Sequence, residues 1–153
     1  MLPSYSIEPA KPAHVSAMSD ALRAGDAAEI EAAGFRPGQA LWRSYRGSLF
    51  ARTGFVGGQI AAMWGMGGCP LGSIGRPWLL TAPPVENIKV SFVRVGRAEI
   101  GLMLAICPEL RGYVDARYHR AIRFLEVLGF NVGEPFPLGA QRAPFREYRM
   151  KRI

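Results

Sequence analysis

The sequence predicts a single domain, residues 1–153, of the α/β class and more closely of the α+β type. Residues 115–130 carry apolar side chains at helical spacing, followed by a glycine where a helix would end. Residues 49–53 and 59–66 read as two strands, and Gly57-Gly58 between them suits a tight hairpin. Apolar residues make up 49% of the chain and charged residues 20%, which is typical of a globular protein with a real core.

Composition narrows the classes of function. The first residues have no basic stretch followed by an apolar run, and no apolar stretch is long enough to span a bilayer, so we expect no signal peptide and no membrane span. The net charge of +7 is carried mostly by arginine. A basic surface favours nucleic acid, a phosphorylated cofactor or an acidic protein face, although arginine-rich codon usage and ordinary solubility explain it equally well.

The two cysteines, Cys69 and Cys107, are far apart in the sequence and lack the spacing of metal ligands. We expect unpaired thiols in a reducing compartment, and no metal site.

The N-terminal half predicts one strand and three short helices before the hairpin. Pro12 suits the first position of a helix, Asp26 is a plausible N-cap, and Gly34 a helix end. The expected elements are a strand at 5–8, helices at 12–22, 26–33 and 37–45, and the hairpin strands at 49–53 and 59–66.

A glycine-rich loop at 67–75 leads to a strand at 76–81 and a long helix at 85–106 that ends before Pro108. One side of this helix is apolar and consists of Ile88, Phe92, Val95, Leu102, Met103 and Ile106. Glu99 falls within that stripe. A buried carboxylate is costly unless it is paired, so we expect an arginine partner from another element; the alternative is a catalytic base with a raised pKa.

The C-terminal part predicts a strand at 110–114 and then a helix capped by Asp115 and ended by Gly129, with Phe130 folding back onto its last turn. Strands at 131–134 and 144–153 follow. In the last strand a period of two places Phe145, Glu147, Arg149 and Lys151 on one face, and Arg146, Tyr148, Met150 and Arg152 on the other.

This strand, helix, Leu128-Gly129-Phe130 and strand resemble the C-terminal half of the GNAT acyltransferase fold. Ala121 and Leu128-Gly129-Phe130 fall in register with the family's pattern, and the order of elements is similar over nearly the whole chain. The resemblance implies a mixed, mostly antiparallel sheet flanked by helices. Two positions depart from it: Tyr118 replaces the family's usual asparagine, and Leu125 replaces its acidic tyrosine.

The resemblance also implies where acetyl-CoA would bind. In the family, a glycine-containing loop before the third helix holds the pyrophosphate with bare amides. Here Pro83 and Pro84 each remove an amide donor at that junction, no glycine is present, and Glu86 adds a negative charge. We therefore expect no cofactor, or acetyl-CoA if the chain is catalytic. The corresponding cofactor-binding residues would be Leu80, Thr81, Val85, Glu86, Asn87 and Ile88.

No catalytic residue is assigned. Leu125 cannot donate a proton, and Tyr118 and Glu99 remain as the two candidates. His14 and His119 stand in no arrangement that suggests a triad.

A larger part of the chain, including residues 76–81, 108–110, 113–117 and 120–130, is similar to GNAT-like internal virion or assembly proteins of short-tailed bacteriophages. This resemblance implies a non-catalytic protein of the virion or the host cytoplasm that acts through contacts with other phage proteins. Its contact surface would be the arginine face of the 115–130 helix together with the basic C-terminal strand. The alternative is that these arginines are simply solvated, and a basic surface could also bind nucleic acid. This surface comprises Arg117, Arg120, Arg123, Arg149 and Arg152.

The alternative is an acyl-CoA-dependent N-acetyltransferase with a divergent cofactor loop. Acetyl-CoA would then lie between the diverging strands 78–81 and 113–115, against residues 85–88, and the amine would enter near Trp64 and the 67–75 loop.

Overall fold

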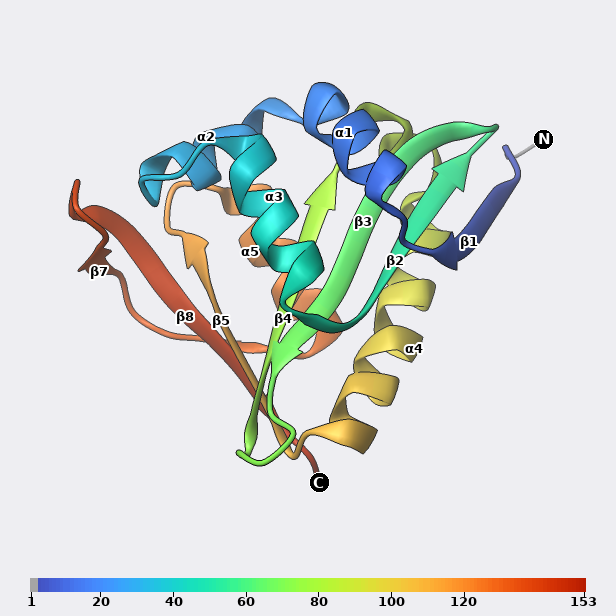
Figure 1. Cartoon of the computed structure of the whole chain (residues 1–153). Coiled ribbons are helices and arrows are strands. Elements are labelled where there is room, and N and C mark those ends of the chain that lie inside the picture. Colours follow the sequence, from blue (N-terminus) through green and yellow to red (C-terminus); the bar gives the residue numbers. More distant parts are fainter. Residues whose placement is uncertain (1–2) are drawn as a thin grey trace.

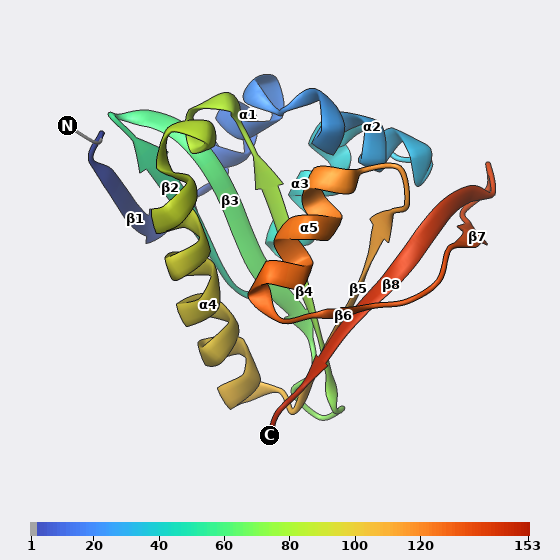
Figure 2. The same cartoon turned by 180° about the vertical axis from the view of Figure 1, so that it is seen from behind.

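A computed structural model describes residues 3–153. One sheet runs through the molecule in the order β1-β2-β3-β4-β5-β8-β6, with β7 added on β8. Helices α1, α2 and α3 cover one face of this sheet, and α4 and α5 cover the other (Figures 1 and 2). The strands are β1 (Tyr5–Pro9), β2 (Ser48–Val56), β3 (Gln59–Gly68), β4 (Ile74–Thr81), β5 (Glu109–Asp115), β6 (Asn131–Val132), β7 (Phe136–Leu138) and β8 (Ala143–Lys151). The helices are α1 (Pro12–Ala21), α2 (Ala24–Ala32), α3 (Pro37–Arg46), the 3₁₀ helix η1 (Pro83–Ile88), α4 (Lys89–Ile106) and α5 (His119–Leu128).

The sheet is antiparallel except where β4 meets β5. These two parallel strands are registered only at Ile74 with Glu109 and at Gly75 with Leu110, after which no further pairs form. The strands therefore diverge towards Thr81 and Asp115, and the sheet opens into a V between them (Figure 1). The predicted mixed, mostly antiparallel sheet flanked by helices is confirmed, and the V is the feature that positions the site.

Two clusters of buried side chains hold the helices on the two faces. Beneath α4 and α5 lie Trp64, Met66, Ile100, Met103, Leu110, Val114, Ile122, Phe130 and Tyr148. Beneath α1 and α3 lie Val15, Met18, Leu41, Met63 and Ala82. Alternate residues of β3 serve the two clusters, because successive side chains of a strand point to opposite faces.

Helix α4 starts later than its apolar pattern predicts, and two residues of the predicted apolar side are exposed. Residues 83–88 form a 3₁₀ turn, so the α-helix begins at Lys89 rather than near Val85. Leu102 and Ile106 are 48% and 49% exposed, and their assignment to the core face was wrong. The buried residues of the helix are Glu99, Ile100 and Met103, and Glu99 and Met103 lie in the predicted stripe.

Helix α5 ends as predicted but begins four residues later. Gly129 adopts a left-handed conformation with φ 103°, and the Phe130 amide donates to the Leu125 carbonyl at 3.0 Å. Asp115 is not the N-cap: it ends β5, and the first helical residue is His119. Its carboxylate accepts instead from the backbone and the guanidinium of Arg117 at 2.8–2.9 Å, and this local pair replaces capping.

Asp26 is not an N-cap either. Helix α2 already begins at Ala24, so Asp26 lies in its first turn, where its buried side chain bonds to β4. The strand expected over 131–134 is also shorter than predicted, because β6 ends at Val132.

The prediction of two unpaired thiols was wrong. Cys69, beside the β3–β4 turn, and Cys107, directly after α4, form a disulfide with their Cα atoms 5.9 Å apart. The β3–β4 hairpin and the chain reversal after α4 bring together residues separated by 38 positions, which spacing in the sequence does not reveal.

In the part of the chain that the structure describes, no helix is both long enough and apolar enough to cross a bilayer.

Candidate functional site

The V between β4 and β5 opens into a cleft of about 460 Å³. Its walls come from β4, η1, α4, β5 and α5, and the start of α2 lies across one end. The side chains that line it include Arg23, Asp26, Glu29, Leu79, Thr81, Val85, Glu86, Lys89, Phe92, Tyr113, Tyr118, Arg120, Arg123, Phe124, Leu125 and Tyr148. The lining thus combines charged and apolar groups from α2, β4, η1, α4, β5, α5 and β8.

Glu86 organises the mouth of this cleft. It sits on η1, and its carboxylate pairs with Arg23 from the segment before α2, with Arg120 Nη2 of α5 at 2.5 Å and with Lys89 Nζ at 3.3 Å. Partial burial acts to raise the pKa of Glu86, but the charges of these three partners outweigh it and lower the pKa. One carboxylate therefore ties η1 to α2 and α5.

Asp26 lies deeper, at the end where α2 meets β4. Its Oδ2 atom accepts from the Thr81 backbone amide at 2.8 Å and from the Thr81 hydroxyl at 2.5 Å. Burial raises the pKa of Asp26, and hydrogen bonds from Thr81 and Tyr118 counteract the rise only in part. The ring of Tyr118 lies so close to Gly25 that a Cβ atom there would be 2.6 Å from it, so α2 needs glycine at this position.

Glu29 stands one turn further along α2 and completes an acidic floor. Burial raises its pKa to about 8, helped by the negative charges of Asp26 and Asp115 and opposed by a hydrogen bond from the Asp115 backbone. Tyr118 beside it also has a raised pKa of about 12, again chiefly through burial. At neutral pH these groups are mostly protonated, and Glu29 gains or loses its proton near pH 8.

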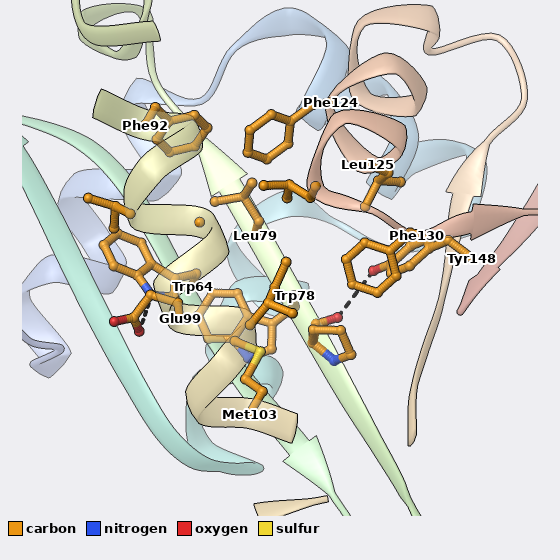
Figure 3. A pocket seen from close by; sticks show the side chains of 15 residues that line it. Trp64, Trp78, Leu79, Phe92, Glu99, Met103, Phe124, Leu125, Phe130 and Tyr148 are labelled. Carbon is orange, nitrogen blue, oxygen red and sulfur yellow. Dashed lines mark hydrogen bonds between the residues drawn. The ribbon is translucent and has the colours of Figure 1, made fainter. Parts of the chain in front are cut away.

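An apolar chamber of about 90 Å³ continues the cleft beneath α4 and α5 (Figure 3). Both spaces share Leu79, Phe92, Phe124, Leu125 and Tyr148 as lining residues. Phe92 and Phe124 stack with ring centroids 5.0 Å apart, and Phe130 meets Tyr148 edge-on at 5.1 Å. The Tyr148 hydroxyl donates to the Pro77 carbonyl at 3.3 Å, and burial raises the pKa of this phenol.

Glu99 borders this chamber but is fully engaged. Its carboxylate accepts from Trp64 Nε1 at 2.9 Å and pairs with Arg52 Nη1 of β2 at 3.2 Å. The predicted arginine partner from another element is confirmed. Two partners give Glu99 the geometry of a structural ion pair.

The fold places only some of the predicted cofactor-binding residues in the cleft. Thr81, Val85 and Glu86 line the cleft. Leu80 packs on the opposite face of the sheet, in the cluster beneath α1 and α3, and Ile88 packs against Val56 and Ala61. Asn87 is exposed. Of the two catalytic candidates, Tyr118 lies in the cleft and Glu99 only at the chamber.

The five arginines expected to form one contact face are also dispersed. Arg117 pairs with Asp115, Arg120 with Glu86, and Arg152 Nε donates to the Leu104 carbonyl at 2.6 Å. Arg123 lines the cleft, whereas Arg149 lies on β8 opposite Arg111 of β5. They do not converge on a single face.

Several residues at the site were missed by sequence reasoning. Arg23, Glu29 and Tyr148 reach the cleft from elements that are distant in the chain, and Lys89 directly follows the predicted residues 85–88. Asp26 and Glu29 did carry a signal, because two acids three residues apart share one face of a helix. Nothing in the sequence showed that this face meets the ends of β4 and β5.

The junction before α4 does not fit a pyrophosphate. A phosphate-binding helix start presents free amides and tolerates no carboxylate. Here Pro83 and Pro84 occupy the first positions of η1, and Glu86 holds the surrounding cations. Leu125, an apolar chamber residue, has no proton to donate. In residues 3–153 no group of three metal-ligating side chains converges.

Solved structures with the same architecture identify the fold. An Acinetobacter baylyi acetyltransferase described as putative matches 99% of this chain and 95% of its own, with 12% identity and a TM-score of 0.71. The chain has the GNAT fold. A GNAT-family acetyltransferase from Streptococcus pneumoniae matches 97% and 100% of the two chains, with 14% identity and a TM-score of 0.65. An aminoglycoside acetyltransferase in complex with coenzyme A matches 97% and 95%, with 14% identity and a TM-score of 0.68.

No protein-family model and no curated protein sequence matches the chain. At identities of 12–14% the likeness to solved GNAT structures shows a shared fold and not a shared activity.

Proposed function

We propose that this GNAT-fold chain performs no acyl transfer and acts through protein contacts in a bacteriophage particle or in its assembly. One observation carries the non-catalytic part: the ionic cluster of Glu86 with Arg23, Lys89 and Arg120 stands where a GNAT enzyme would bind the cofactor's pyrophosphate. A phosphate entering there would be repelled by the carboxylate and would have to displace it from three cations.

Leu125 supports the same proposal from the chemical side. Acyl transfer from a thioester needs an acid that protonates the departing thiolate. Leu125 packs among the apolar residues of the chamber, and Tyr148, which shares this lining, donates its hydroxyl hydrogen bond to the Pro77 carbonyl. Two further phenols line the cleft, Tyr113 and Tyr118. The pKa of Tyr118, raised to about 12, makes this phenol a poor proton donor at neutral pH.

The phage assignment is supported by the sequence resemblance of residues 76–81 and 108–130 to internal virion and assembly proteins. It predicts that other phage proteins are the partners and that the chain resides in the virion or the host cytoplasm. Mass spectrometry of purified particles tests this directly. Absence of the chain from particles would restrict the proposal to assembly or to a role inside the host.

Calorimetric titration with acetyl-CoA tests the non-catalytic proposal. We expect no saturable heat at millimolar cofactor. A matched Glu86→Gly variant shows whether the carboxylate is the obstacle, because it removes the negative charge and leaves the three cations free. Micromolar binding by the unmodified chain would overturn the proposal.

The second candidate is an N-acetyltransferase with a divergent cofactor loop, and Glu29 is the observation that favours it. A carboxyl with a pKa of about 8 at the floor of an open cleft is suited to take a proton from an ammonium substrate. This function requires a rate that rises through about pH 8 as Glu29 ionises, and that loses this rise in Glu29→Gln. An acetyl-CoA-dependent activity without that pH profile would exclude Glu29 as the base.

A further inference from the structure

Three neighbouring strands each place an arginine in one row across the sheet. Arg111 of β5 and Arg149 of β8 are direct cross-strand partners. Arg76 of β4 directly follows Gly75, whose pair with Leu110 is the last between β4 and β5, so Arg76 stands one residue beyond the ladder, as Arg111 does on β5. Leu110 and Tyr148, the neighbours of Arg111 and Arg149 in their strands, pack beneath α4 and α5. The arginines therefore point to the opposite face, the one that carries α1, α2 and α3.

Such a row is unfavourable without a counter-ion. Adjacent strands lie only about 4.8 Å apart, and like charges directly opposite each other destabilise a sheet. Within residues 3–153, the one acid that pairs with the row is Glu109, which contacts Arg111 Nη2 at 3.3 Å. The Nε atom of Arg111 is buried and has no hydrogen-bond partner among the described residues. The row therefore retains excess positive charge and an unused donor.

The row is accessible from solvent. Arg76 and Arg149 are exposed, and the Arg111 side chain is 33% exposed. Helices α1 to α3 lie over β2, β3, β4 and the far end of β5, and no helix lies in front of the adjoining stretches of β5 and β8 (Figure 1). A partner can approach the arginines without moving any element of the fold.

We propose that Arg76, Arg111 and Arg149 form a docking site for carboxylates of an acidic segment on a partner protein. The site rests on the proposed function, because it supplies the protein contact which that function needs. Guanidinium groups hold planar carboxylates with two parallel hydrogen bonds, and the exposed side chains of Arg76 and Arg149 present such groups to solvent.

The surroundings of the row favour an acidic protein over nucleic acid. The cross-strand pairs two residues to either side of Arg111 and Arg149 each contain an acid. These pairs are Glu109 with Lys151 and Tyr113 with Glu147. The row thus consists of three arginines, and acidic residues lie in the cross-strand pairs on both sides of it. Nucleic-acid affinity draws on several successive phosphates, which would extend over these acids. Tyr113, the exposed aromatic beside the row, already packs edge-on against Phe136 at 5.9 Å.

A labelled oligoglutamate peptide, measured by fluorescence anisotropy at low salt, tests the site. We expect Arg149→Glu to weaken binding by about tenfold or more, because it both removes a cation and repels the peptide. Arg123→Glu is the matched control, since it makes the same charge change in an exposed residue of α5. It should change the affinity less than about twofold.

The Arg149→Glu variant gives a second readout, its thermal stability, which should change in the opposite direction to its affinity for the peptide. Arg149→Glu supplies Arg111 with an opposite charge directly across the ladder, so its melting temperature should rise while binding falls. A misfolded variant would instead show both weaker peptide binding and a lower melting temperature. Glu109→Gln should strengthen peptide binding, because it frees Arg111 from its competing carboxylate.

Three outcomes would overturn the proposal: equal loss of binding in Arg149→Glu and Arg123→Glu, no peptide binding at millimolar concentration, or tighter binding of a single-stranded oligonucleotide than of the peptide. The last outcome would assign the row to nucleic acid. Failure of the non-catalytic proposal remains distinguishable, because acetyl-CoA binding is measured separately and involves the cleft, not this face.

Discussion

The two ends of the cleft use the same side chain in opposite ways. At the mouth, Glu86 is surrounded by three cations that lower its pKa, so it stays ionised. At the floor, Glu29 has acids for neighbours and a buried setting that raises its pKa to about 8, so it is mostly protonated at neutral pH. The difference shows that partners and burial, not residue type, decide the charge of a carboxyl group.

The same comparison separates structure from chemistry. At the mouth, the carboxylate of Glu86 is paired with three cations, and these ion pairs join three elements where a GNAT enzyme would bind phosphate. At the floor, Glu29 is buried near two other acids, and its raised pKa lets it exchange a proton near pH 8. On the non-catalytic proposal, the ion pairs close the cofactor entrance of the cleft, while its interior still carries a titratable group.

Reduction of the Cys69–Cys107 disulfide is expected to have the largest effect, and it provides a reference that touches neither end of the cleft. The free energy of unfolding should fall by about 2–4 kcal/mol, because the unfolded chain regains conformational entropy. Urea unfolding with and without reductant, at acidic and alkaline pH, measures this fall and should give the same value at both. A double cysteine-to-serine variant should not respond to reductant. Rapid alkylation of both thiols without reductant would contradict the pairing.

Replacing Asp26 at the floor is expected to have the next largest effect. Asp26→Ala leaves the Thr81 amide and hydroxyl without their acceptor in a buried position, which should cost about 2–3 kcal/mol. Asp26→Asn retains one acceptor oxygen and should cost less. Chemical denaturation of both variants decides the order, and equal losses would mean that packing rather than hydrogen bonding matters at this position.

Glu29→Gln tests the floor through its pH dependence. Because the folded-state pKa of Glu29 is raised, its contribution to stability is fully present below the unfolded-state pKa and is lost as the pH rises through about 8. The glutamine variant has no such loss, so it should match the unmodified chain near pH 4 and exceed it by a margin that grows as the pH rises to about 8. Parallel stability profiles for the two proteins would show that Glu29 titrates normally.

Glu86→Gln tests the mouth and should give the smallest effect, with the opposite pH dependence. A lowered pKa means that the stabilising contribution is present above the unfolded-state pKa and is lost as the pH falls through the folded-state pKa. Because the side chain is 32% exposed, the loss at neutral pH should stay below about 1 kcal/mol and shrink in high salt. A larger loss that salt does not reduce would indicate a packing role.

Sequence reasoning succeeded where local patterns specify local structure. The hairpin at Gly57-Gly58 and the end of α5 at Gly129 were predicted because these turns need a left-handed backbone, which glycine adopts readily. It failed at Asp115 and Asp26, which look like caps by position but bond to Arg117 and to Thr81. It also failed at Leu102 and Ile106, because periodicity defines a stripe without fixing which edge faces the core.

The candidate site was predicted only in outline. Thr81, Glu86 and Tyr118 were named as candidates, but Glu29, Arg23 and Lys89 were not, because the cleft forms from elements far apart in the chain. The arginine row was hidden for the same reason, since Arg76, Arg111 and Arg149 have no regular spacing in the sequence.

The sequence by itself determined the order of strands and helices apart from η1 and β7, the position of the proline-rich junction and the absence of a side-chain proton donor at Leu125, because each depends on local residue identity. The tertiary structure alone decided the Cys69–Cys107 pairing, the opposite pKa shifts of Glu29 and Glu86, and the alignment of the arginines. Charge, burial and disulfide formation depend on distances between side chains, and only the folded sheet sets those distances.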